Sequence, residues 1–153
     1  DIGSYLSTVG VAMAKAAPST MGTLMATGFM RGGKALGECS EMDAASMAVF
    51  FRAFTDALMA RGKSAPGEKT IVDLMDPVAR AAQDAVEAGA DRASLATAIT
   101  TAATVAIENV KTMIAQHGKA AVFREQTADK PDPGAEAGAL VVQAFAEALL
   151  RQD

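Results

Sequence analysis

The chain has 153 residues, of which half are apolar and 5% aromatic, with a formal net charge of −4. This length predicts one domain, residues 1–153, that is large enough for a hydrophobic core. The charge argues against a nucleic-acid surface, no apolar run reaches the roughly 18 to 20 residues of a membrane span, and the single cysteine, Cys39, indicates a cytoplasmic protein without an internal disulfide.

Apolar residues recur at helical spacing in six segments, which clusters of Gly, Pro, Ser and Thr separate. The predicted helices cover about residues 1–15, 21–36, 42–61, 70–87, 91–116 and 133–151. No segment shows sustained alternation with a period of two, so we expect no β-sheet. The chain is therefore predicted to be all-α, an antiparallel up-and-down bundle or barrel of about six helices.

The first connection, A-A-P-S-T, ends the first helix because Pro18 disfavours helix at the residue before it. Ser19 or Thr20 is expected to cap the second helix. That helix contains Gly22, Gly28, Gly32 and Gly33, whose spacing favours close helix packing or close approach of a ligand.

The third helix presents an apolar stripe and ends at Gly62, where the loop G-K-S-A-P-G-E-K-T begins. This loop differs from a phosphate-binding P-loop, because Glu68 separates Gly67 from Lys69 and both flanks are helical. The alternative is a turn that presents Lys63, Lys69 and Thr70 to a ligand. The stripe residues are Met47, Phe50, Phe51, Phe54 and Leu58.

The fifth helix is expected to end near His117 and Gly118, with His117 as a solvated residue at the helix end. The segment 118–135 that follows has no helical period. It ends in Asp132 and Pro133, an N-cap and a first helical residue. The residues predicted to face inward from the last helix are Leu140, Val141, Ala144, Phe145, Ala148 and Leu149.

A helix start presents unpaired N–H groups to an anion such as a phosphate. In an up-and-down bundle, alternate connections lie at the same end, so the loops 16–23, 62–70 and 118–135 are expected to meet there. The other two connections, near 37–41 and 88–91, are short and carry no basic residue. The asymmetry favours a nucleotide or phosphate site at one end, although plain capped connectors remain the alternative.

Several residues in these loops match the pattern of one known family. They are Gly22-Thr23, Gly62-Lys63, Pro66-Gly67, Lys69-Thr70 with Asp73, Pro77, Gly118 with Ala120, and Asp132-Pro133-Gly134-Ala135. In them the chain resembles the nucleotide-binding L subunit of dihydroxyacetone kinases. The resemblance implies a helical barrel that binds ADP or ATP and relays a phosphoryl group to dihydroxyacetone, or a related short ketose, on a partner K subunit or domain. In some family members an M subunit of a phosphotransferase system rephosphorylates the ADP.

The resemblance, together with the physics of helix starts, assigns roles to ten residues. Phosphates or ribose are expected at Ser19, Thr20, Gly22 and Thr23. The base is expected at Pro66 and Gly67, and one phosphate at Lys119. The pocket floor is expected at Asp132, Pro133 and Gly134. No catalytic residue and no metal ligand is assigned within this chain.

Family members hold Mg²⁺ through a G-D-x-D-H-G motif, and this sequence has neither a Gly-Asp nor an Asp-His pair. The corresponding region would precede Asp1, so the resemblance implies an N-terminally incomplete domain that lacks two family helices. Lys119 and Gln126 also stand where the family has arginine. The alternative to a kinase component is a non-catalytic interaction or regulatory module that kept the fold and lost the metal–nucleotide site.

Overall fold

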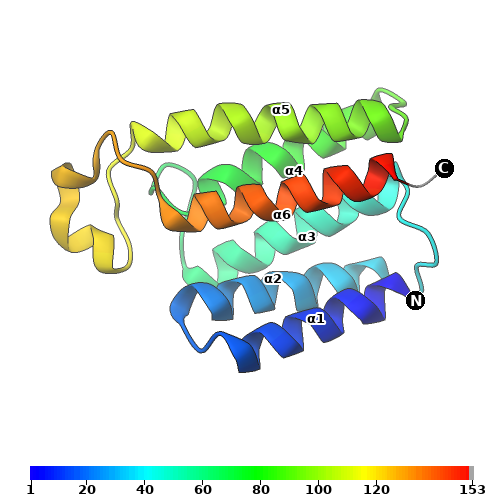
Figure 1. Cartoon of the computed structure of the whole chain (residues 1–153), viewed down its shortest axis with the longest axis horizontal. Helices are drawn as coiled ribbons and strands as arrows, with labels where there is room; N and C mark the ends of the chain where they lie inside the picture. The colour runs from blue at the N-terminus through cyan, green and yellow to red at the C-terminus, as the bar shows by residue number, and fades with distance from the viewer. Residues whose placement is uncertain (152–153) are drawn as a thin grey trace.

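The computed structural model describes residues 1–151, apart from the side chain of Lys119. Its elements in chain order are α1 (Ile2–Ala16), α2 (Thr20–Leu36), α3 (Ala44–Gly62), α4 (Val72–Glu87), α5 (Arg92–Lys111), the 3-10 helix η1 (Lys119–Thr127) and α6 (Pro133–Leu150). Figure 1 shows the six α-helices side by side, with consecutive helices running in opposite directions. The described residues contain no strand, which confirms the predicted all-α antiparallel architecture.

Side-chain caps fix where five of the six α-helices begin. Each cap accepts a hydrogen bond from the backbone N–H three residues further on, and each contributes about 1 kcal/mol. The capping residues are Asp1, Ser19, Asp43, Asp91 and Asp132. Of the two predicted caps of α2, the structure therefore selects Ser19.

Two predictions about the fifth connection are wrong. Helix α5 ends at Lys111 and not at Gln116, because the carbonyl of Lys111 accepts from the backbone N–H of Asp129 at 2.7 Å. The segment 118–135 was predicted to lack helix, yet it contains η1. A 3-10 turn needs only local bonds, such as the one from Ala121 N to Gly118 O, and therefore leaves no apolar period in the sequence.

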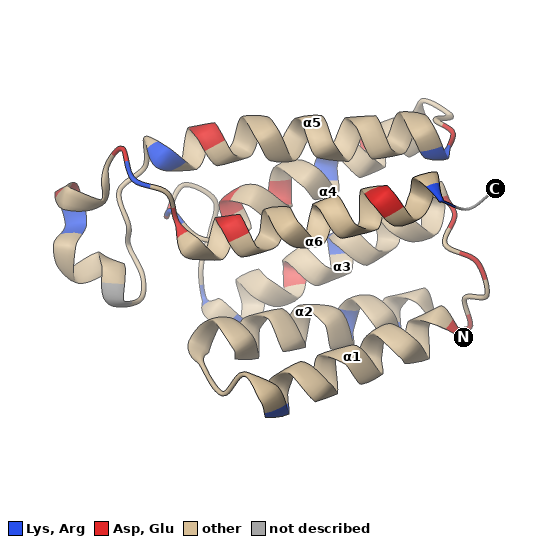
Figure 2. Ribbon diagram, in the orientation of Figure 1, with Lys and Arg blue, Asp and Glu red and all other residues tan. Residues whose placement is uncertain are grey.

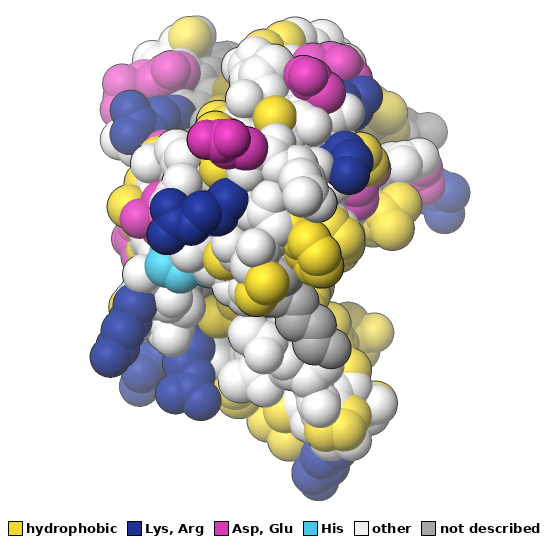
Figure 3. All heavy atoms as spheres, turned by 90° about the vertical axis from the view of Figure 1, so that its left-hand side faces the viewer, with side chains coloured by type: hydrophobic (Ala, Val, Ile, Leu, Met, Phe, Trp, Pro, Cys, Tyr) yellow, Lys and Arg dark blue, Asp and Glu magenta, His cyan; other side chains and the backbone are white. Residues whose placement is uncertain are grey.

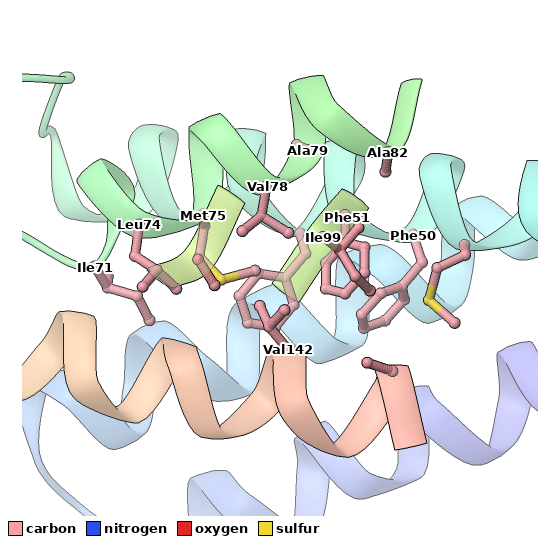
Figure 4. Packing of buried hydrophobic residues seen from close by; sticks show 14 of the residues in the cluster. Phe50, Phe51, Ile71, Leu74, Met75, Val78, Ala79, Ala82, Ile99 and Val142 are labelled. Atoms are coloured by element: carbon pink, nitrogen blue, oxygen red, sulfur yellow. The ribbon is translucent and has the colours of Figure 1, made fainter. Parts of the chain in front are cut away.

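Five of the six phenylalanines form one aromatic cluster at the centre of the bundle. Ring centroids lie 4.7 Å apart for Phe50 and Phe145, and 5.4 Å apart for Phe29 and Phe54. Phe50, Phe51 and Phe54 are fully buried. Figure 4 shows Phe50 and Phe51 beside the aliphatic residues of α4, which include Leu74, Met75 and Val78. The cluster joins α2, α3 and α6 into one core.

Glycines set the spacing between neighbouring helices, as the sequence predicts. A Cβ at Gly28 would lie 2.7 Å from the ring of Phe54, and one at Gly32 would lie 2.6 Å from that of Phe50. Helices α1 and α2 meet through Gly3 and Gly33, where a Cβ at either residue would lie 2.5 Å from the other helix or its following turn. Helix α1 packs chiefly on α2.

The inward face predicted for α6 is partly wrong. Leu140 is 68% exposed and Ala144 and Ala148 are also exposed, whereas Val142 is buried. The buried face is built on small residues, because a Cβ at Gly138 would lie 2.9 Å from Leu74 of α4. The prediction, which followed the large apolar residues, therefore chose the wrong face of α6 as the buried one. The buried residues of α6 are Gly134, Ala135, Gly138, Val142, Ala146 and Leu149.

The first, third and fifth connections lie at one end of the molecule, and the second and fourth lie at the other, next to both chain ends (Figure 1). The N-termini of α2, α4 and α6 consequently point the same way, as the sequence predicts. The 3-10 helix η1 projects beyond the ends of the α-helices. None of the helices within residues 1–151 is long and apolar enough to span a membrane.

Candidate functional site

A cavity of about 1100 Å³ opens at the end where the first, third and fifth connections meet. It takes its lining from α1, from the start of α2, from the end of α3 and from the segment before η1. The lining residues are Ala14, Pro18, Ser19, Thr20, Met21, Thr23, Leu24, Arg61, Gly62 and Gly118. We call this cavity the end groove. Figure 3 views this end of the molecule and shows Lys and Arg side chains along one border of it.

The start of α2 forms one wall of the end groove. Pro18 interrupts the helical path, and the hydroxyl of Ser19 then accepts the N–H of Gly22 at 3.0 Å. The N–H of Thr23 donates to the carbonyl of Ser19. Within the described residues, the N–H groups of Thr20 and Met21 have no protein acceptor. A positive helix end with spare donors is a typical environment for an anion.

The starts of α4 and α6 lie close to that wall. A Cβ at Gly134 would lie 2.6 Å from the terminal methyl of Met21 and 3.5 Å from the backbone nitrogen of Ile71. The N-terminal turns of α2, α4 and α6 are thus in contact. Three partial positive charges at one place favour a negatively charged ligand more than one helix end does.

Asp132 sits at this junction and caps α6, accepting the N–H of Ala135 at 2.9 Å. Burial raises the pKa of the Asp132 carboxyl, while the bond from Ala135 and the charge of Lys69 act in the opposite direction. Because the pKa of the Asp132 carboxyl is raised in the folded state, ionising this carboxyl costs more free energy there than in the unfolded chain. The ionised form is therefore less stabilising here than at an exposed helix start.

Replacing Asp132 by asparagine is expected to keep the cap and remove this charge penalty, because asparagine caps helices about as well as aspartate. At neutral pH the melting temperature of the Asn variant should equal or exceed that of the wild type. The penalty is absent below the ordinary pKa of 3.8, grows as pH rises through the raised folded pKa, and is complete above it. Melting curves recorded across this pH range measure the effect.

The matched control is Asp132→Ala, which removes charge and cap together and should cost roughly 1 kcal/mol of unfolding free energy at neutral pH. An Asn variant that melts below the Ala variant would contradict the role given to Asp132 as a cap.

Pro66 and Gly67 line a different cavity, of about 410 Å³, between α4 and α5. Its other lining residues include Asp73, Asn109 and Met113. The structure therefore brings Ser19, Thr20, Thr23 and Gly118 together and leaves Pro66 and Gly67 at a second opening. Pro133 is exposed at the start of α6, and Gly22 is buried beneath the wall of α2. The side chain of Lys119 lies outside the described residues.

The connection between α3 and α4 is held in shape by one carboxylate. Asp73 is buried, and it accepts the N–H groups of Gly67 and Thr70, the latter at 2.8 Å. The loop in turn contacts the fifth connection, because Glu68 pairs with the imidazole of His117 and accepts the N–H of Gln116. His117 is exposed, as predicted for a solvated residue, but it does not lie at the end of α5, because that helix ends at Lys111.

The sequence does not reveal that Lys69 is buried. Its side chain is only 4% exposed, although it stands in a polar loop. Desolvation lowers the pKa of its ammonium group, and the charges of Asp132 and Asp129 partly oppose that shift. The alternative in which this turn presents Lys69 to a ligand is wrong, since the ammonium group is enclosed by protein.

The end groove has no carboxylate among its lining residues. No group of three or more His, Cys, Asp or Glu side chains lies together in the described part of the chain. Mg²⁺ prefers several oxygen ligands that include one or two carboxylates. The residues at the end groove therefore do not by themselves fit the metal, and no chemical step is assigned to it.

Comparison with known proteins places this geometry in a family. A family model described as the DAK2 domain matches residues 1–147. The ADP-binding subunit DhaL of the PEP-dependent dihydroxyacetone kinase of Escherichia coli is 28% identical over 146 residues, which cover 95% of this chain and 70% of that subunit. The L-erythrulose 1-kinase of Mycolicibacterium smegmatis is 32% identical over 145 residues, which cover 93% of this chain and 24% of that enzyme.

The mammalian relatives match a shorter stretch. Human triokinase/FMN cyclase is 33% identical over 94 residues, which cover 61% of this chain and 16% of that protein. The chain thus spans most of the bacterial subunit but a quarter or less of the larger kinases. The activities in their names belong to proteins of which this chain matches only a part.

Proposed function

Since the chain belongs to the DAK2 domain family, we propose that it binds ADP or ATP as the nucleotide-binding part of a kinase for dihydroxyacetone or a related short ketose. The ketose is held by a partner K subunit or domain. The phosphoryl donor is ATP itself or an M subunit of a phosphotransferase system. This assignment makes the chain one component of a larger phosphotransferase.

The observation that carries the proposal is the end groove. Its volume of about 1100 Å³ accommodates a nucleotide, and it combines the spare amides of the α2 start with the guanidinium of Arg61. Helix-start amides bind phosphate oxygens, and a guanidinium binds them in a fork. Met21 and Leu24 add apolar surface for a base or ribose.

The groove also suits phosphoryl relay because it opens at the end of the molecule. In this proposal Arg61 and the α2 amides hold the phosphates, while the terminal phosphate stays accessible to a second protein. The names of these relatives include two short ketoses, dihydroxyacetone and erythrulose, which supports a short ketose as the acceptor of the phosphoryl group. Positioning and charge stabilisation are the protein's main contribution to phosphoryl transfer.

Isothermal calorimetry with Mg-ADP on the full gene product tests the proposal. Saturable heat, together with a rise in melting temperature at increasing ADP, is the expected result. An absence of both heat and thermal shift would remove the nucleotide function. That result would favour the alternative, a non-catalytic helical module that interacts with another protein.

Thr23 offers a mutation that tests the groove itself. Thr23→Glu places a carboxylate on the wall where the phosphates are expected, and like charges repel in a partly buried site. Binding of ADP should weaken by about tenfold or more, which corresponds to roughly 1.4 kcal/mol. The control is Thr97→Glu, which adds the same charge at an exposed position of α5. Equal ADP affinities for the two variants would place the nucleotide elsewhere.

A further inference from the structure

One buried ammonium group organises the whole fifth connection. The Nζ atom of Lys69 donates to the backbone carbonyls of Lys111 at 3.3 Å, Met113 at 3.1 Å and Lys130 at 2.7 Å. It also donates to the carbonyl of Thr127. These acceptors stand at both ends of the excursion between α5 and α6. The side chain of Lys69 thus joins the segment that follows α5 to the segment that leads into α6.

The segment between α5 and α6 has little apolar packing to hold it, so its order depends on polar contacts; besides those of Lys69, these include the pairing of Glu68 with His117 and the bond from the N–H of Ala115 to the hydroxyl of Thr127. Among the described side chains of residues 112–132, only Ala115 and Thr127 are buried. Val122 and Phe123, the large apolar residues of η1, are 82% and 59% exposed. A segment without an apolar core of its own depends on its polar contacts for order. Hydrogen bonds from a charged donor in a dehydrated site are the stronger kind.

Neighbouring residues orient the side chain of Lys69 toward these carbonyls. Its backbone has a φ of 58°, in the left-handed region that non-glycine residues rarely adopt. The carboxylate of Asp73 holds that turn by accepting the N–H groups of Gly67 and Thr70 on either side of it. Backbone strain that is held by surrounding bonds is typical of positions with a specific task.

Two residues at this end of the molecule, Gly118 and Asp132, follow the segments that Lys69 binds. Gly118, which lines the end groove, follows the carbonyls of Lys111 and Met113, and Asp132 follows that of Lys130. The oxygen atoms of both anchoring stretches accept from the same ammonium group. Lys69 therefore links the position of Gly118 in the groove lining to the position of Asp132 at the start of α6.

We infer that Lys69 is a positioning residue, which fastens residues 111–130 so that Gly118 lines the end groove and the start of α6 stays in contact with Met21 of that lining. It acts on the nucleotide through the backbone that it holds and not by direct contact. The inference rests on the proposed nucleotide binding for its functional part. Its structural part, the fastening of the segment, stands on the contacts of Lys69 alone.

The variant Lys69→Met keeps all but the last atom of the side-chain length and removes its three donors. Hydrogen exchange in the absence of nucleotide is expected to show about tenfold faster exchange at Ala115, Gln116 and Asp129, whose N–H groups are bonded within or to this segment. Exchange in the aromatic cluster of α3 should stay close to the wild-type rate. Unchanged exchange in residues 112–132 would overturn the inference.

The second measurement is the affinity for Mg-ADP, made well below the melting temperature of each variant. If the segment is ordered in only about a tenth of the molecules, the apparent affinity of Lys69→Met falls about tenfold. A purely structural role would lower the melting temperature and leave this affinity unchanged. The control Lys34→Met removes one positive charge from an exposed position of α2 at the other end.

Two outcomes separate this inference from the proposed function. If the unsubstituted protein binds Mg-ADP and Lys69→Met binds it equally well, the positioning role is overturned and nucleotide binding stands. If the unsubstituted protein binds no Mg-ADP, the proposed function fails, and hydrogen exchange still decides whether Lys69 fastens the segment. Should Lys69→Met not fold, Lys69→Gln, which retains two donors, is expected to show the same changes at smaller size.

Discussion

Replacing Phe50 by alanine is expected to lower the free energy of unfolding by about 3–5 kcal/mol, the largest loss among the substitutions considered. Phe50 is fully buried and contacts the rings of Phe29, Phe51, Phe54 and Phe145, from three helices. Its removal takes away apolar contact and leaves a cavity that rigid neighbours cannot fill. Chemical denaturation monitored by circular dichroism measures the loss.

Phe123→Ala is the matched control for Phe50, since it makes the same chemical change at a side chain that is 59% exposed. Its effect on unfolding should stay within roughly 0.5 kcal/mol. A loss below about 1 kcal/mol for Phe50→Ala would show that the aromatic cluster is not the centre of the core.

Replacing Gly22 by alanine is expected to disturb the wall of the end groove and the fold together. A Cβ at Gly22 would lie 2.0 Å from the backbone oxygen of Ala17, so the turn before α2 must move. Overpacking against backbone costs roughly 1–3 kcal/mol of stability. The same movement displaces Ser19 and Thr20, so ADP affinity should fall about tenfold or more. Thermal melts and calorimetry measure the two effects.

Gly62→Ala is the control for Gly22→Ala. Its Cβ would approach nothing closer than the side chain of Leu24, at 3.3 Å. Because Gly62 is helical, alanine there should stabilise α3 or leave it unchanged. Comparable losses of stability for both variants would indicate that the turn at Ala17 tolerates a side chain after all.

The sequence predicted those elements whose local chemistry is self-contained. Helix starts followed from Ser19 and Asp132, because a capping side chain bonds to an amide only three residues away. The meeting of the first, third and fifth connections followed from the alternation of antiparallel helices, which is a rule of topology. Glycine spacing in α2 correctly indicated close packing, since Gly28 and Gly32 lie against phenylalanine rings.

Features that depend on distant partners could not be predicted. The end of α5 at Lys111 is set by Asp129 and Lys69, neither of which is near it in the sequence. The rotation of α6 was misjudged because Gly138 and Ala146, not Leu140, face the core. Lys69 itself stands in a loop of polar residues, where a lysine is normally exposed. Only the fold encloses it.

The attachment of α1 has a consequence for how the molecule opens. Because α1 packs chiefly on α2 and buries only Gly3, Leu6 and Gly10, against six or more residues in each other α-helix, its detachment exposes the least buried surface. It should therefore be the first α-helix to separate in sub-global unfolding. Ala14, near the end of α1, borders the end groove. A nucleotide bound there would therefore hold α1 against α2 and slow the exchange of the α1 amide hydrogens with solvent deuterium.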